Sequence, residues 1–236
     1  MGEPYIHDEC IVLKRIPFRD VDANIILLGR SLGKICVLAK GLSKASSKLS
    51  SILNVGNVVT VNLFNGKSGF TLLSASQLSD NQRSFNSYEA LLTCMYLCEM
   101  VDNGIEPESS QEDIYNLLVN VLKNMDDTNI IEARLYFEWH FLVYSGYASN
   151  ERAFFRSLCQ NNCFENENDC LLQETICDEI YSFLMIQMQG RCCALYLSKL
   201  ARKNFKEILC MFYKKYFDFK IKSKMMLDEA TNHFYS

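Results

Sequence analysis

The sequence predicts an α+β fold, in which a five-stranded β-barrel at residues 1–80 is followed by an all-helical domain at residues 81–236. Apolar residues recur with a period of two through the first eighty residues, as they do in half-buried strands. From about Ser84 the period becomes 3.6, which is typical of amphipathic helices. The chain of 236 residues is 49% hydrophobic, which is enough to form packed cores in both parts.

Five short strands are expected, around Val12 and over residues 24–28, 35–38, 58–64 and 70–73. Gly33 lies between the second and third strands, where it can take the positive φ of a tight turn, and Asn65–Gly66 predicts a turn after the fourth. A longer excursion separates the third strand from the fourth. This is the plan of an OB-fold barrel, and an SH3-like barrel with the same number of strands is the alternative.

The rest of the chain predicts helices. One helix is expected at 88–98, a second begins with a capping box of Ser109 and Glu112 and continues to Met125, and a third is expected at 129–144. Two more are expected between 178 and 217. A polar, Cys-rich segment at about 157–178 is expected to form a loop inserted among these helices. The expected domain boundary is Ser79–Ser84, because the periodicity changes there.

The net charge of −4 is unevenly distributed along the chain. Residues 1–80 carry a net +3, residues 81–198 a net −12, and residues 199–236 a net +5. Binding depends on the electrostatic field within about one Debye length, roughly 8 to 10 Å, so the charge of each segment says more about partners than the total does. Both basic ends are therefore candidates for binding a polyanion.

A cationic loop follows the third expected strand. Lys40, Lys44 and Lys48 stand among glycine and serine residues, with no carboxylate between the first lysine and the last. A flexible backbone, hydroxyl donors and unneutralised point charges suit the phosphates of a nucleic acid. The alternative interpretation is that these lysines are solvated surface charges that only keep the protein in solution.

Base stacking would require exposed aromatic residues near this loop. Phe18, Phe64 and Phe70 are the candidates in the barrel, and we expect at least two of them to face the core. Binding is therefore expected to be dominated by the phosphate backbone, independent of base sequence and sensitive to salt.

Several short motifs form a pattern in the first segment: Ile11-Val12-Leu13-Lys14, Asp20, Asp22, Leu32-Gly33-Lys34, Leu38-Ala39-Lys40-Gly41, Lys44 and Ser47-Lys48. Weaker matches follow at Phe137-Glu138 with Leu142, at Gly146-Tyr147 and at Lys220-Ile221-Lys222-Ser223. Together these residues resemble the RecO family of bacterial recombination mediators. The resemblance touches all parts of the chain and is most specific in the first forty residues.

The resemblance implies an OB-fold and a non-enzymatic role in DNA repair and homologous recombination. Such a mediator binds single- and double-stranded DNA without sequence specificity, promotes strand annealing and helps to load the recombinase onto single strands in the RecF pathway. The implied protein partners are RecR and the tail of the single-strand binding protein. The implied location is the bacterial cytoplasm, in association with the nucleoid.

Eight residues are expected to contact DNA on this basis. They are Lys14, Arg15, Lys34, Lys40, Lys44, Lys48, Lys220 and Lys222. The first six belong to the barrel and the last two to the basic carboxy-terminal tract. The expected mechanism is neutralisation of phosphates, which lowers the repulsion between strands as they pair.

A cysteine cluster marks a candidate metal site. It consists of Cys159, Cys163, Cys170 and Cys177. The resemblance implies one structural Zn²⁺ bound by two CxxC pairs at this position, and four thiolates suit tetrahedral zinc. The gaps here are three, six and six residues, so neither pair is CxxC, and unligated cysteines are the alternative.

Other functional classes are less well supported. Gly29–Lys34 lacks the spacing of a phosphate-binding loop, so no nucleotide is expected. The apolar stretches are too short to span a membrane, and the amino terminus has no secretion signal. Two rivals remain: an adaptor whose acidic helical domain binds protein partners with little direct DNA contact, and a cysteine-dependent enzyme. The second would need a thiol of lowered pKa beside a histidine such as His140, for which a packed, structural role is the alternative.

Overall fold

The computed structural model describes residues 4–44, 47–79, 85, 87–107, 111–161, 170–185 and 196–217; the side chains of 159–161 and 170–173 are not described. The described residues fall into two compact units, the first within Met1–Asp127 and the second within Thr128–Lys220. The first unit contains the barrel and also the first two long helices, which follow the boundary predicted at Ser79–Ser84.

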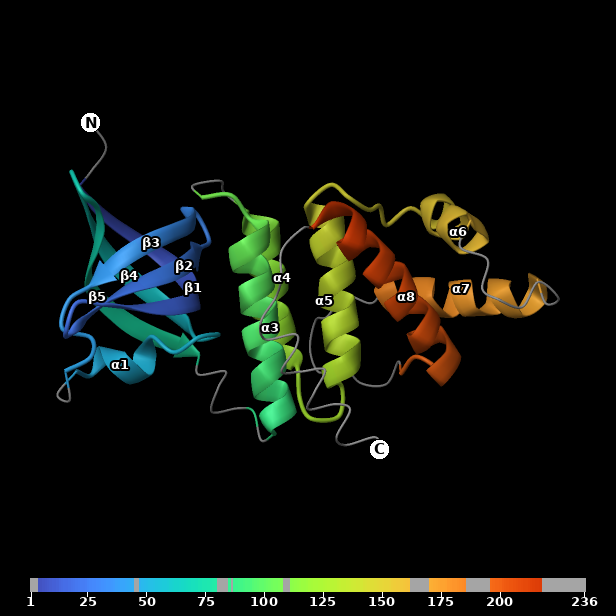
Figure 1. The fold of residues 1–236 in the computed structure, drawn as a ribbon, viewed down its shortest axis with the longest axis horizontal. Coiled ribbons are helices and arrows are strands. Elements are labelled where there is room, and N and C mark those ends of the chain that lie inside the picture. Colours follow the sequence, from blue (N-terminus) through green and yellow to red (C-terminus); the bar gives the residue numbers. More distant parts are fainter. Residues whose placement is uncertain are drawn as a thin grey trace. The chain divides into compact units, whose positions relative to one another are not determined.

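A closed five-stranded barrel forms the amino-terminal part, as predicted (Figure 1). Its elements are β1 (Tyr5–Phe18), β2 (Asp22–Gly29), β3 (Gly33–Ala39), the short helix α1 (Leu49–Ile52), β4 (Val58–Gly66) and β5 (Gly69–Ser79). The strand order is β1-β2-β3-β5-β4, with β3 and β5 parallel and the other described pairs antiparallel. The excursion between the third and fourth strands carries α1, and the whole arrangement agrees with an OB-fold.

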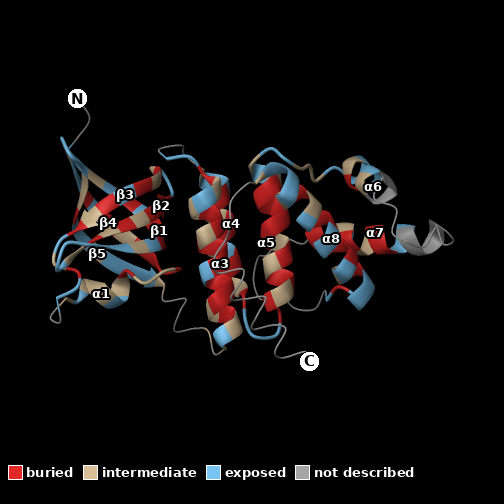
Figure 2. Ribbon diagram, in the orientation of Figure 1, coloured by how far each residue is buried: buried red, intermediate tan, exposed pale blue. Residues whose placement is uncertain are grey.

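Alternate residues of each strand fill the barrel (Figure 2). Ile25 and Leu27 of β2, for example, are fully buried, whereas Ile26 between them is only half-buried. β1 pairs with β4 over Tyr5–Ile11 and with β2 over Cys10–Phe18, and its register with β2 shifts between Val12 and Lys14. Such a bulge bends the strand, which closes a small barrel.

One predicted turn is confirmed and the other is wrong. Gly33 has φ +69° in the β2–β3 turn, as expected. The β4–β5 turn lies two residues beyond Asn65–Gly66, because both of those residues still pair with β5. Its loop is Lys67–Ser68, and Gly69, with φ +104°, supplies the left-handed conformation.

The helices α3 (Tyr88–Gly104) and α4 (Glu112–Asn124) complete the first unit. α3 begins at Ser87, whose side chain accepts a hydrogen bond from the Ala90 N–H at 3.1 Å. It packs against β1, and a Cβ at Gly56 would collide with the buried Sγ of Cys94. The glycine therefore permits close contact between the barrel and α3.

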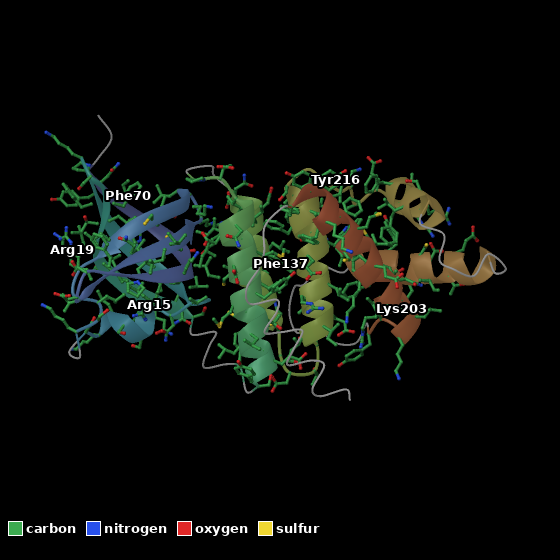
Figure 3. All side chains as sticks on the ribbon, viewed as in Figure 1. Arg15, Arg19, Phe70, Phe137, Lys203 and Tyr216 are labelled. Atoms are coloured by element: carbon green, nitrogen blue, oxygen red, sulfur yellow. The ribbon has the colours of Figure 1, made fainter. Side chains whose placement is uncertain are left out.

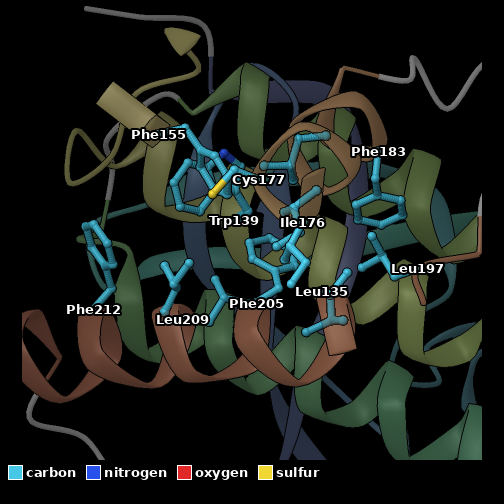
Figure 4. Packing of buried hydrophobic residues seen from close by; sticks show 14 of the residues in the cluster. Leu135, Trp139, Phe155, Ile176, Cys177, Phe183, Leu197, Phe205, Leu209 and Phe212 are labelled. Carbon is cyan, nitrogen blue, oxygen red and sulfur yellow. The ribbon is translucent and has the colours of Figure 1, made fainter. Parts of the chain in front are cut away.

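The second unit contains α5 (Ile130–Tyr144), α6 (Arg152–Asn161), α7 (Cys170–Leu184) and α8 (Lys199–Tyr216). Trp139 on α5 lies in a buried cluster with Phe155 of α6 and with Phe205 and Phe212 of α8 (Figure 4). α5 is also tied to α8 by an ion pair between Glu132 and Arg202.

The Cys-rich segment is more helical than predicted. The sequence predicts a loop at about 157–178, whereas α6 extends to Asn161 and α7 starts at Cys170. The reason is an apolar stripe that begins inside this segment with Ile176 and Cys177 and continues into the range already predicted to be helical. Its described members on α7 are Ile176, Cys177, Ile180, Phe183 and Leu184, and all of them are buried in the cluster around Trp139.

His140 makes the stability of the second unit depend on pH. Its ring is buried, stacks on Tyr136 at a centroid distance of 4.0 Å and places Nδ1 2.9 Å from the Tyr136 carbonyl oxygen. Burial lowers the pKa of His140 below its ordinary value of 6.5. The unfolded chain therefore takes up the proton first, so the stability that the neutral ring provides is complete above about pH 6.5 and is lost as the pH falls through the folded-state pKa.

We expect the free energy of unfolding to fall between pH 7 and pH 5 by more in the native chain than in His140→Gln. The difference between the two slopes should approach at most about 1.4 kcal/mol per pH unit, the limit for one proton. Urea unfolding at pH 5, 6 and 7 measures both slopes. Equal slopes in the two proteins would contradict the assignment.

Candidate nucleic-acid interface

Two loops of the first unit are joined by hydrogen bonds. The β1–β2 turn accepts through the Val21 carbonyl from the Ser43 N–H at 2.9 Å, and through Asp22 Oδ1 from the Gly41 N–H at 2.8 Å. Gly41 has φ +65°, which glycine adopts without steric cost. The turn after β1 and the lysine-bearing loop after β3 therefore form one continuous surface.

The lysine-bearing loop is anchored to the barrel, where the sequence predicts a flexible segment. Leu42 is fully buried in the barrel core. Farther along, the Arg15 guanidinium of β1 donates to the Ser50 carbonyl at 2.8 Å, and the Asn57 side chain donates to the Ile52 carbonyl at 3.2 Å. These contacts fix the described parts of the loop and α1 while the lysine side chains stay in solvent.

Four exposed cations lie on this surface: Arg19, Lys40, Lys44 and Lys48. We call these four residues the cationic surface. Arg19 has φ +55°, and its guanidinium carbon lies 5.0 Å from the centroid of the Phe18 ring (Figure 3). Asp20 adds an exposed carboxylate to the same turn, while the Asp22 carboxylate is engaged with Gly41. The positive charges outnumber the negative ones by four to two.

Arg19 was not among the residues predicted to contact DNA. A turn residue becomes a candidate only when its neighbours in space are known, and the lysine-bearing loop is more than twenty residues away in the sequence. The usable signal was the position of Arg19 between two predicted strands of a barrel, since OB-folds bind oligonucleotides with the loop between strands 1 and 2.

Lys14 and Lys34 both contact Asp102 of α3. Lys14 Nζ lies 3.0 Å from Asp102 Oδ2, and Lys34 Nζ donates to the Asp102 backbone carbonyl at 2.6 Å. The Asp102 side chain is 13% exposed and that of Lys14 is 49% exposed. Both lysines therefore connect the barrel to α3, and their role in binding DNA stays a prediction.

Three other predicted residues have different placements. Arg15 is half-buried, and its guanidinium donates to the Ser50 carbonyl of α1, the helix that follows Lys48. Lys220 and Lys222 lie outside the described residues. The described end of the basic tract is the last turn of α8, where Lys214 and Lys215 are exposed.

The aromatic prediction is wrong. Phe18 and Phe64 are 36% and 37% exposed, and Phe70 is half-buried against the barrel core, so fewer than two of the three are buried. Phe18 is the last paired residue of β1, opposite Asp22 of β2. Phe64 is an exposed residue of β4 that follows Leu63, which is buried. Stacking residues are therefore available on the barrel surface.

The cysteines give no metal site among the described residues. Cys177 is buried in the helical cluster, Cys163 lies outside the described residues, and the side chains of Cys159 and Cys170 are not described. The four-cysteine zinc site stays a prediction.

Three described thiols have a raised pKa. Burial is the main cause for Cys10 and Cys36, and a hydrogen bond with Cys94 is the main cause for Cys98. A nucleophilic cysteine requires the opposite direction, because the thiolate is the reactive form. These three residues therefore offer no support for a cysteine-dependent enzyme.

In the described part of the chain, no helix combines the length and the apolar character needed to cross a membrane.

The barrel topology and the helices that follow it define an OB-fold protein with an appended helical region. Two family models match the chain: Recombination protein O N terminal over residues 1–81 and Recombination protein O C terminal over residues 86–225. The second alone covers more than half of the chain. The protein therefore belongs to the RecO family.

Curated relatives carry the same family name. A DNA repair protein RecO from Clostridium acetobutylicum is 31% identical over 147 residues, which are 59% of this chain and 58% of the relative. One from Dehalococcoides mccartyi is 30% identical over 138 residues, 58% of this chain and 54% of the relative. In these two matches the chain spans little more than half of the relative. One from Exiguobacterium sibiricum is 23% identical over 242 residues, 95% of this chain and 96% of the relative.

Proposed function

We propose that this protein is a DNA repair and homologous recombination mediator that binds single- and double-stranded DNA without sequence specificity. The observation that carries the proposal is the cationic surface, in which hydrogen bonds hold the β1–β2 turn against the lysine-bearing loop of an OB-fold. Exposed cations held on a fixed backbone attract phosphates and read no base. The names of the curated relatives support a role in DNA repair.

The proposed mechanism is electrostatic. Arg19, Lys40, Lys44 and Lys48 neutralise phosphates, which lowers the repulsion between complementary strands and lets them anneal. The same contacts hold a single strand ready for transfer to the recombinase in the RecF pathway. No covalent step is required, and RecR and the tail of the single-strand binding protein are the proposed protein partners. The proposed place of action is the nucleoid in the bacterial cytoplasm.

The experiment is fluorescence anisotropy with labelled oligonucleotides of several sequences, single- and double-stranded, across a salt series. Four phosphate contacts predict that log K for single strands falls with log salt at a slope of about −3, with little difference between sequences. Acceleration of the annealing of complementary strands, measured on the same oligonucleotides, tests the second half of the proposal.

An adaptor is the alternative, and the charge of residues 81–198, a net −12, is the observation that favours it. An acidic helical region repels DNA and suits a basic protein partner. Absence of binding at 20 mM salt would overturn the mediator proposal and leave the adaptor.

A further inference from the structure

An exposed aromatic pair lies on the barrel, and the cationic surface does not include it. Tyr5 of β1 stands directly opposite Phe64 of β4, with ring centroids 5.7 Å apart and ring planes inclined by 54°. Tyr5 is 65% exposed and Phe64 is 37% exposed. Cross-strand aromatic pairs stabilise sheets by roughly 0.2 to 1 kcal/mol, so a purely structural role is the alternative explanation.

The surroundings of the pair favour a ligand. The adjoining β4–β5 turn presents Lys67 in solvent, and a Cβ at Gly66 would lie 3.0 Å from Phe64 Cε1, so the ring lies across bare backbone. A Cβ added at Gly69, on the other side of the turn, would have no atom within 4 Å. The turn therefore offers a cation and open space beside two exposed rings.

A row of polar side chains runs beside the rings. His7 Nδ1 lies 2.8 Å from Asn62 Oδ1, and the Asn62 amide donates to Ser74 Oγ at 2.8 Å. All three residues are exposed, and the register places His7 opposite Asn62 and Asn62 opposite Ser74. Glu9, the next outward-facing residue of β1, lies 3.9 Å from Arg30. An aromatic pair bordered by hydrogen-bonding side chains fits a nucleobase better than it fits the apolar face of a protein.

We propose that Tyr5 and Phe64 form a base-stacking subsite for single-stranded DNA, with Lys67 contacting a neighbouring phosphate. This inference rests on the proposed function and adds a preference for single-stranded over double-stranded DNA. Phosphates are present in both forms of DNA, so the cationic surface alone discriminates little between them. Only an unpaired base offers its face to a ring, because the bases of a duplex are already stacked on one another.

The test compares the native chain with Tyr5→Thr/Phe64→Thr, in which threonine keeps a residue of high strand propensity at each position. Anisotropy is measured with oligo-dT and with a duplex of the same length. Loss of one stacked base weakens the binding of oligo-dT by roughly 5- to 150-fold. Duplex affinity stays within about twofold, and the salt slope for oligo-dT is unchanged because no phosphate contact is removed.

Tyr88→Thr is the matched control. Tyr88 is 59% exposed and begins α3 in the same unit, so its replacement removes an exposed tyrosine away from the pair. It should leave both affinities unchanged. Tyr5→Trp/Phe64→Trp should retain oligo-dT binding, since tryptophan also stacks on bases, and circular dichroism establishes that each variant is folded.

Two outcomes overturn the inference. One is unchanged oligo-dT affinity in the threonine variant, and the other is an equal loss on oligo-dT and on the duplex. In both cases the proposed function stands as long as the native chain binds DNA and loses that binding when the cationic surface is neutralised. If the native chain binds neither probe at 20 mM salt, the proposed function fails and this inference fails with it.

Discussion

Replacing Lys40, Lys44 and Lys48 with glutamine is expected to weaken the binding of single-stranded DNA about 100-fold at 0.1 M salt. Each lost phosphate contact removes roughly 0.7 from the slope of log K against log salt, so the slope should become shallower by about 2. The three side chains are exposed and their loop is held by Leu42 and Gly41, so the fold should be unaffected. Anisotropy across a salt series measures both quantities.

A matched variant separates the loop from the total charge. Lys123→Gln with Asn103→Asp and Asn120→Asp also makes the chain more negative by three charges, at exposed positions on α3 and α4. It should bind nearly as well as the native chain and keep the native slope. Equal weakening by the two triple variants would mean that net charge, and not the cationic surface, governs binding.

Phe205→Ala is expected to destabilise the second unit, which contains α5 to α8, by about 3 to 5 kcal/mol. Phe205 is fully buried, and its ring centroid lies 5.9 Å from that of Trp139, 6.4 Å from that of Phe183 and 6.5 Å from that of Phe155. Alanine would leave a cavity where three helices meet α8. For a unit of this size the loss corresponds to a decrease in Tm of at least about 12 °C.

Leu200→Ala is the control for this substitution. Leu200 lies on the same helix and is 43% exposed, so its truncation should change stability by no more than about 0.5 kcal/mol. Urea unfolding followed by circular dichroism at 222 nm compares the two variants. Similar losses in both would show that the cluster around Trp139 is not the core of the unit.

Regular elements were predictable because their signals are local. Two short apolar segments with a glycine between them predicted the β2–β3 hairpin that the structure confirms. Features that depend on pairing across the barrel were not predictable in the same way. The β4–β5 turn lies two residues beyond Asn65–Gly66 because these residues still pair with β5. The first part of α7 falls in the Cys-rich segment that was predicted to be a loop.

The residues of the candidate site also divide into those that the sequence indicates and those that only the fold brings together. The run of lysines is visible in the sequence, and the structure finds Lys40, Lys44 and Lys48 exposed. Contacts between distant residues are not visible. Asp102 is 88 residues from Lys14 in the chain, so nothing local indicates that this lysine has a carboxylate partner. Phe64 is a stacking candidate from the sequence, but its outward orientation and its pairing with Tyr5 depend on the strand register. The place of Arg19 beside the lysine-bearing loop also depends on the fold.

The single tryptophan of the chain allows the second unit to be followed by fluorescence separately from the first. Trp139 is completely buried in the helical unit, and the barrel unit contains no tryptophan. Emission excited at 295 nm therefore follows the environment of the second unit alone. If the barrel melts first, the emission stays constant while the far-ultraviolet signal of the strands is lost. A titration with DNA in which this emission does not change would place the bound strand away from the surroundings of the indole.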